Sequence, residues 1–241
     1  MCRHEAAEAL GALGDQGSLF LLKDRRADAQ EVVVVRETCE LAVDRIEWEH
    51  SPQRLSEKCK DSDFSSIDPA PPMPLQKEKQ EPDIPILQSR LMDFKLPLFE
   101  RYRAMFALRD LASPPDLPTA VPAVQALAEG FKDGSALFRH EIAFVFGQLS
   151  HPASIPSLTR VLGDLKEESM VRHEAAEALG SLGDEEGVME TLESFRNDDE
   201  QVVKDSIVVA LDMAEFERSG EAEYATIESN GVAKGAHAVA A

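Results

Sequence analysis

The sequence has few aromatic residues, few cysteines and no long apolar run, and each shortage excludes a class of protein. Aromatic residues make up 6% of the 241 positions, while words rich in alanine, leucine and glutamate dominate, which favours helices over sheets. The three cysteines form no CxxC or zinc spacing, so we expect a reduced, intracellular protein, cytoplasmic in location. No run of about 18 apolar residues is present, so we predict no membrane-spanning helix. The N-terminus lacks the basic and apolar pattern of a secretory signal.

Basic residues are also scarce. Lysine and arginine number 25 against 45 acidic residues, which gives a net charge of −20. Such a surface repels the phosphates of nucleic acid, so we expect no nucleic-acid partner. Two interpretations of the acidity remain open. It can serve as an ordinary solvated surface, or it can attract a basic protein partner.

The dominant positive feature is a repeat. Residues 1–15 read MCRHEAAEALGALGD and residues 170–184 read MVRHEAAEALGSLGD, with differences only at the second and twelfth positions. A looser copy, FRHEIAFVFGQLS, covers residues 138–150. The spacing of 33 residues between the His-Glu pairs of the last two copies is that of a helix-turn-helix repeat. The sequence therefore predicts an all-α solenoid in which helical pairs stack on their neighbours.

Apolar periodicity places the helices, and proline content separates them into two groups. We expect helices over 1–14, 18–23, 32–48, 97–111, 119–130, 140–149, 154–165, 173–184, 186–196 and 201–216. Seven of the fourteen prolines lie between positions 50 and 88, which predicts a flexible, unpacked linker. Gly11, Gly147 and Gly180 recur inside the repeat helices, where we expect close approach between stacked backbones.

A second repeat relates the two ends of the chain at an offset of 169 residues. It predicts two pseudo-symmetric halves: a short first half over 1–50, a linker over 51–88, a second half over 89–217, and a disordered tail over 218–241. By the same symmetry, the mate of the His140 repeat would precede residue 1. We therefore expect a further N-terminal repeat with a fourth His-Glu pair, absent from a truncated gene model or an expression fragment.

The His-Glu pairs are the candidate functional residues, and they lie at equivalent repeat positions: His4-Glu5, His140-Glu141 and His173-Glu174. Each stands near a helix start, where the helix dipole favours an ionised carboxylate and a neutral imidazole, which is the form that binds a divalent metal. Two pairs facing each other across stacked helices would supply two histidines and a carboxylate, the ligand set of non-haem iron. The HExxH pattern of zinc proteases is absent.

Other interpretations of these residues stay open. The His-Glu pairs can be a structural motif retained from duplication of the repeat, with the glutamate capping its helix. Glu8 and Glu177 can orient the histidines one turn earlier, or simply face solvent. The remaining histidines, at 50, 151 and 237, are expected to be solvated. A metal-free helical-repeat scaffold that binds a protein partner, and a helical-repeat lyase acting on bilin chromophores, are the alternative functions.

Several words together resemble the deoxyhypusine hydroxylase family over residues 1–217: the two RHEAAEALG copies, GSALFRHE, PLFERYRAMFALRDL and IDPAPP. This resemblance implies a HEAT-like repeat fold in two halves around a di-iron centre. It also implies a monooxygenase that uses molecular oxygen and two ferrous ions to hydroxylate the deoxyhypusine side chain of a translation factor.

The same resemblance assigns roles to individual residues. His140, His173 and Glu174 resemble one complete set of iron ligands, and His4 with Glu5 resembles half of the other. Glu141 is similar to a glutamate that lies near the metal and pairs with the substrate's amine. We therefore count Glu141 with both the metal-site residues and the catalytic residues.

Overall fold

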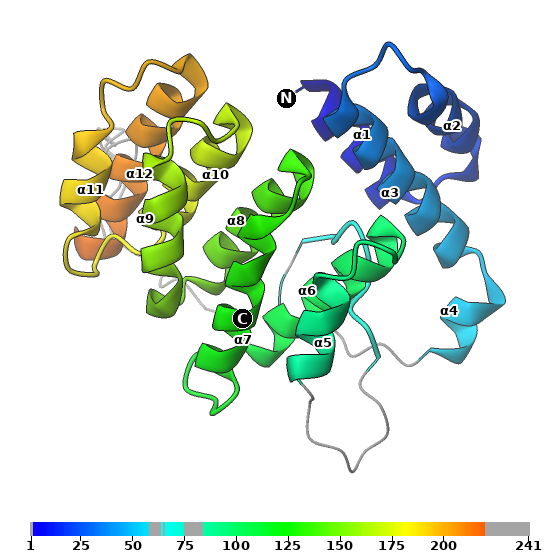
Figure 1. The fold of residues 1–241 in the computed structure, drawn as a ribbon, viewed down its shortest axis with the longest axis horizontal. Coiled ribbons are helices and arrows are strands. Elements are labelled where there is room, and N and C mark those ends of the chain that lie inside the picture. The colour runs from blue at the N-terminus through cyan, green and yellow to red at the C-terminus, as the bar shows by residue number, and fades with distance from the viewer. Residues whose placement is uncertain (1, 58–63, 65, 75–83, 220–241) are drawn as a thin grey trace, which may run out of the picture.

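The computed structural model describes residues 2–57, 64, 66–74 and 84–219, and every regular element among them is helical (Figure 1). In chain order the α-helices are α1 (Cys2–Leu13), α2 (Leu19–Ala27), α3 (Val33–Glu49), α4 (Pro52–Ser56), α5 (Ile84–Leu91), α6 (Leu98–Leu111), α7 (Ala120–Ala128), α8 (Ala136–Leu149), α9 (Ile155–Gly163), α10 (Ser169–Gly180), α11 (Val188–Ser194) and α12 (Gln201–Ser219).

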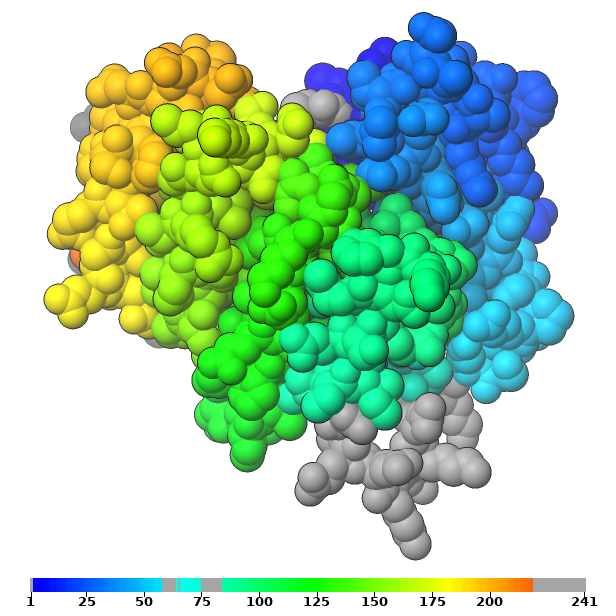
Figure 2. Space-filling view, in the orientation of Figure 1, coloured from blue at the N-terminus to red at the C-terminus, as the bar shows by residue number. Residues whose placement is uncertain are grey.

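The helices form two packed groups, here called lobes: α1–α3 make one, and α5–α12 make the other. Helices α8, α10 and α12 lie side by side, and α9 and α11 cover α10 and α12. In the other lobe α1 lies against α3, and α2 packs on α3. Helix α3 also contacts α6 and α8, which joins the lobes. Figure 2 shows a notch between the lobe of α9–α11 and the lobe of α1–α3.

The buried apolar side chains divide in the same way. One cluster of seven buried residues (Ala7, Leu22, Val35, Cys39, Ala42, Val43 and Ile46) belongs to α1, α2 and α3 alone. A much larger cluster runs from α5 to α12 and takes in Leu41 of α3. Leu41 is the link because it points to the second lobe while its neighbour Ala42 packs in the first. Each lobe thus has its own core, and α3 contributes to both.

Part of the predicted linker is packed, which corrects the expectation of unpacked chain for these residues. Asp68 forms two 2.8 Å contacts with the guanidinium of the fully buried Arg109 on α6. Arg45 of α3 donates to the backbone oxygen of Asp68, and Met73 N donates to the backbone oxygen of Arg103 at 3.1 Å. Ala70 is fully buried. Residues 66–74 contain four prolines and form no helix. Side-chain hydrogen bonds to the backbone oxygens of Asp68 and Pro71 hold them between α3 and α6.

The expected helices are present to within a few residues, whereas α4 lies inside the predicted linker and was not expected. The run of valines at the start of α3 is helical despite its β preference, because Val35 and the following turns pack against α1 and α2. The last helix extends to Ser219, slightly past the expected start of the tail at 218. The rest of that tail, with His237, and Cys59 in the linker lie outside the described residues.

In the part of the chain described here, none of the helices combines the length and the apolar character needed to cross a membrane.

Candidate metal centre

An arginine precedes each His-Glu pair and fixes the helix that carries it. Arg172 is 2% exposed and forms a two-pronged ion pair with Asp198, with one contact at 3.0 Å. Arg139 pairs with Glu167, with its Nε 2.8 Å from a carboxylate oxygen, and Arg3 pairs with Glu31 at 3.0 Å. In all three copies the acidic partner lies 26 to 28 residues further along the chain. The buried or half-buried Arg172 and Arg139 therefore hold the starts of α10 and α8 to a residue further along the chain. Arg3 is 69% exposed at its side chain, so its pair holds α1 more weakly.

The three histidines come together at the junction of the lobes. His4 on α1, His140 on α8 and His173 on α10 are 1%, 7% and 6% exposed. The ring centroids of His4 and His140 are 5.5 Å apart, and those of His140 and His173 are 5.4 Å apart. Residues separated by more than 130 positions in the sequence thus form one row of buried imidazoles.

Two groups of nitrogen and oxygen atoms within this row are close enough to share a cation. In one, His140, His173 and Glu174 have ligand atoms within 4.8 Å of one another; Glu174 Oε2 is 3.2 Å from His140 Nε2 and 4.0 Å from His173 Nε2. This group bridges α8 and α10. In the other, His4, Glu5 and Glu8 satisfy the same limit, and all three belong to α1.

The Nδ1 nitrogen of His4 is hydrogen-bonded to a side chain of α3, and this bond fixes the orientation of the imidazole ring. Nδ1 lies 2.9 Å from the Thr38 hydroxyl, and that hydroxyl donates its proton to the backbone oxygen of Val34 at 2.8 Å. Nδ1 must therefore be the protonated nitrogen, and Nε2 is left with a free lone pair. Burial, and then the charge of His140, lower the pKa of His4 to about 4, so the ring is neutral near pH 7, as a metal ligand must be.

The Nδ1 nitrogen of His173 is also hydrogen-bonded, but its partners are Glu177 and Ser206. Ser206 of α12 donates to Glu177 at 2.8 Å, and His173 Nδ1 lies 3.4 Å from both the Ser206 oxygen and Glu177 Oε1. Because the serine proton is committed to Glu177, His173 Nδ1 acts as the donor. The hydrogen bond from His173 lowers the pKa of Glu177. Carboxylate partners of this kind orient metal-binding histidines. Glu177 makes the contact with His173 that this interpretation requires, and its side chain is also 39% exposed to solvent.

The unsatisfied atoms of the site are the test of whether a metal fits. Among the described residues, buried Nε2 of His4, both ring nitrogens of His140, Nε2 of His173 and Oε1 of Glu141 have no hydrogen-bond partner. Buried polar groups are nearly always satisfied. Here the unsatisfied imidazole nitrogens lie in one row beside carboxylates, so nitrogen and oxygen ligands for divalent iron are present. The residues fit a metal of this class.

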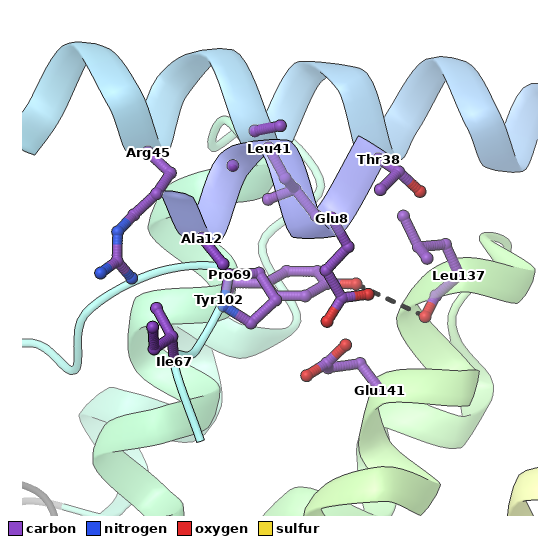
Figure 3. Close-up of a pocket in the computed structure, with 12 residues that line it drawn as sticks. Glu8, Ala12, Thr38, Leu41, Arg45, Ile67, Pro69, Tyr102, Leu137 and Glu141 are labelled. Carbon is purple, nitrogen blue, oxygen red and sulfur yellow. Dashed lines mark hydrogen bonds between the residues drawn. The ribbon is translucent and has the colours of Figure 1, made fainter. Parts of the chain in front are cut away.

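Glu141 lies beside the metal-ligand groups, at the wall of a small cavity. It is 3% exposed, and Figure 3 shows its carboxylate directed towards that of Glu8, with the Tyr102 ring beside them. Burial, and then the charge of Glu8, raise the pKa of Glu141 well above its usual range. The cavity has a volume of about 10 Å³.

Sequence reasoning missed Tyr102, although a signal for it was present. Arg101 and Arg172 each donate Nε to a backbone oxygen ten residues earlier, at 2.9 Å, and each pairs with a buried aspartate. The residue after Arg172 is His173, and the residue after Arg101 is Tyr102. Tyr102 therefore occupies the histidine position of its own repeat, and its hydroxyl donates to the Leu137 backbone oxygen at 3.4 Å.

The predicted site residues differ in their burial. Glu174 is 13% exposed at its side chain, whereas Glu5, its equivalent on α1, is 59% exposed. Of the histidines expected to be solvated, His50 is exposed at the end of α3. The expectation for His151 was wrong. It is 6% exposed because its Nδ1 accepts the Ala153 backbone N–H at 3.1 Å and so caps the following turn.

Comparisons with known proteins agree with this geometry. A family model described as HEAT repeats matches residues 121–212. The chain is 74% identical over 227 residues to a deoxyhypusine hydroxylase of Phaeosphaeria nodorum, a match that covers 94% of this chain and 68% of that protein. It is 71% identical over 231 residues to one of Emericella nidulans, with 96% and 68% covered. A solved structure of human deoxyhypusine hydroxylase in complex with glycerol is 45% identical, with a TM-score of 0.75, and the match covers 88% of this chain and 67% of the human chain.

Proposed function

Because this chain belongs to the deoxyhypusine hydroxylase family of HEAT-repeat oxidoreductases, we propose that its buried histidine row is the iron centre for hydroxylation of deoxyhypusine. The centre would hold two ferrous ions, with molecular oxygen as co-substrate. His140, His173 and Glu174 would bind one ion, and His4 and Glu5 would contribute to the other. The chain spans about two thirds of the length of the curated relatives that it matches.

The observation that carries this proposal is the set of unsatisfied imidazole nitrogens in one buried row. A buried nitrogen without a partner costs about 1–3 kcal/mol, and a bound cation would satisfy several of them at once. The hydrogen bonds of Thr38 and Glu177 support this use because they leave Nε2 as the free nitrogen of His4 and His173.

Each residue of the centre would have a definite task. Bound iron supplies the activation of oxygen, and the chain supplies position and charge. The unpartnered ring nitrogens of the histidines and the Glu174 carboxylate would hold the metal. Glu141 would act on the substrate, because its carboxylate lines the cavity beside the centre and belongs to neither group of candidate metal ligands. It would hold the amine of the side chain next to the metal.

The substrate side chain carries two amines and is presented by a translation factor, which we propose as the protein partner in the cytoplasm. The net charge of −20 supports this pairing, because an acidic surface attracts a basic loop and a cationic side chain. The same charge disfavours nucleic acid. Binding of the partner should weaken as ionic strength rises, since exposed charges are screened beyond about 10 Å at 0.1 M salt. Binding that is insensitive to salt would contradict this part of the proposal.

We further propose that the chain is organised as two pseudo-symmetric halves, over 1–50 and 89–217, with the segment 51–88 between them and a tail over 218–241. The two separate apolar clusters support this division. The equivalent placement of His4 and His173, each held by a hydroxyl from the neighbouring inner helix, supports it as well.

Iron binding and hydroxylation can be tested together. Purified chain would be titrated anaerobically with ferrous iron, iron per chain measured, and hydroxylation of a deoxyhypusine-containing substrate followed by mass spectrometry. His173→Ala and His140→Ala should each remove one iron, and His4→Ala should remove the other. His50→Ala is the matched control, because His50 is an exposed histidine at a helix end. Full iron content and hydroxylation in the His140 and His173 variants would refute the assignment.

A further inference from the structure

Glu8 and Glu177 occupy the same repeat position but have different partners. Each lies one helical turn beyond its histidine, in the words RHEAAE that begin at Arg3 and Arg172. Glu177 accepts a hydrogen bond from Ser206 at 2.8 Å and lies 3.4 Å from His173 Nδ1. Glu8 has neither contact. Its carboxylate oxygen lies 3.9 Å from Nε2 of His4, the nitrogen on the opposite side of the ring.

The cause of this difference is a single hydroxyl on α3. Thr38 accepts the Nδ1 hydrogen of His4 directly and passes its own proton to the Val34 backbone oxygen. His4 is therefore oriented without help from a carboxylate. Ser206, which occupies the matching place on α12, instead gives its proton to Glu177. The first half thus leaves Glu8 free for another task.

The carboxylate of Glu8 faces the cavity that Glu141 also lines (Figure 3). Glu141 is 3% exposed and its Oε1 has no hydrogen-bond partner among the described residues. Within that same part of the chain, neither glutamate forms an ion pair with a lysine or arginine side chain. The hydroxyl of Tyr102 is committed to the Leu137 backbone oxygen. Arg45 also lines the cavity, but its guanidinium donates to the backbone oxygen of Asp68 and lies away from the two carboxylates in Figure 3. The cavity therefore presents two carboxylates to one space, and no cationic side chain of the described residues lies between them.

The size of the cavity fits one small cationic group. Its volume of about 10 Å³ is close to what a single water molecule requires, and an ammonium group is of similar size. Leu41, Leu137 and the ring of Tyr102 supply apolar wall around it, against which methylene groups can pack. The cavity is too small for a whole diamine chain, so the rest of that chain would extend towards the histidine row.

We propose that Glu8 and Glu141 together bind one ammonium group of the deoxyhypusine side chain, with Glu8 as a substrate-binding residue that its repeat mate Glu177 is not. This inference rests on the proposed function for the nature of the substrate. Two carboxylates that share a cavity repel each other, and a bound ammonium replaces that repulsion with two charge-assisted hydrogen bonds. Recognition of a charged amine by such a pair would reject side chains that lack it.

The test compares two peptides and two variants by calorimetry. One peptide carries deoxyhypusine, and the other carries the same side chain with a methyl group in place of the terminal ammonium. Glu8→Gln should weaken binding of the deoxyhypusine peptide by about tenfold or more, the loss expected for a hydrogen bond between charged groups. The affinity for the peptide without the terminal ammonium should not change. Glu186→Gln changes an exposed glutamate between α10 and α11 and is the control. The ratio of its two affinities should be that of the unmodified chain. Circular dichroism would establish that both variants fold.

Iron per chain, measured on the same samples, separates the possible failures. A Glu8→Gln chain that keeps its iron and loses the preference for the charged peptide supports the inference. A Glu8→Gln chain that loses iron makes Glu8 a metal ligand and overturns it. Equal affinities of wild type and Glu8→Gln for the charged peptide also overturn it, and the iron centre then stands on its own test. Absence of iron from the unmodified chain would instead refute the proposed function, whatever the peptides show.

Discussion

Glycine recurs at one position of the repeat helices, and the structure predicts opposite effects of alanine in different copies. A Cβ at Gly180 would lie 2.8 Å from Ala210 Cα and 2.9 Å from its backbone oxygen. A Cβ at Gly147 would lie 3.5 Å from Ala178 Cα, which is ordinary van der Waals contact. The close backbone approach expected at every copy is thus present on α10 and absent on α8.

The magnitudes follow from two opposing contributions. Glycine inside a helix costs about 1 kcal/mol relative to alanine, so Gly147→Ala should stabilise the chain by up to about 1 kcal/mol. Gly180→Ala gains less of this because Gly180 is the last residue of α10. It must also push the α12 backbone away, and overpacking of this kind costs about 1–3 kcal/mol. We therefore expect Gly180→Ala to destabilise the chain by about 1–3 kcal/mol.

Urea unfolding followed by circular dichroism measures both variants against the unmodified chain under the same conditions. Gly11→Ala is a second test of the tight class, since its Cβ would lie 2.9 Å from both Cα and Cβ of Ala42. It should resemble Gly180→Ala. If Gly147→Ala destabilises as much as Gly180→Ala, helix spacing is not what distinguishes these positions and the reasoning is wrong.

Two further predictions concern charged side chains. Asp68→Asn breaks a buried ion pair but leaves Arg109 its contacts with Asp110 and Gln148. The free energy of unfolding should therefore fall by about 2–4 kcal/mol, towards the lower part of the range for a broken buried pair. A fall of less than about 0.5 kcal/mol in urea unfolding would refute the role of this pair. For Asp44, burial, and then the charge of Glu40, raise the pKa to about 6; because the folded state holds that proton more tightly than the unfolded state, stability falls as pH rises from about 4 to about 6. Asp44→Asn should therefore stabilise the chain by about 1–3 kcal/mol near pH 7.5, which is the free energy of the pKa shift reduced for solvent screening. Near pH 4 it should have no effect. Equal effects at the two pH values would show that Asp44 is not the group responsible.

The helices and the histidine row could be predicted from sequence because they depend on repetition. The period of 33 residues and the repeated His-Glu pairs are visible without coordinates, and stacked repeats bring equivalent residues to one face. The packed segment around Asp68 could not be predicted in this way. Its position depends on an ion pair to Arg109, 41 residues away, and the local signal was proline content, which says only that the segment is not helical.

The roles of the second carboxylates were also beyond local sequence reasoning. Glu8 and Glu177 lie in identical words, so no local pattern distinguishes them. What distinguishes them is the hydroxyl that contacts each histidine: Thr38 of α3 contacts His4, and Ser206 of α12 contacts His173. These residues lie 34 and 33 positions from their histidines. Two hydroxyl residues at matching places suggest equal roles, and only the direction in which each gives its proton separates them.

The arginine that precedes each pair explains how one repeat can carry several chemistries. Arg101 and Arg172 make the same contacts to the preceding and following repeats, yet one is followed by Tyr102 and the other by His173. Because the arginine fixes the helix start, the next residue can change from a metal ligand to an aromatic wall without altering the stack. The candidate metal centre and the cavity beside it would then use the same repeat position with different side chains, which would place the proposed amine-binding cavity directly next to the proposed iron site.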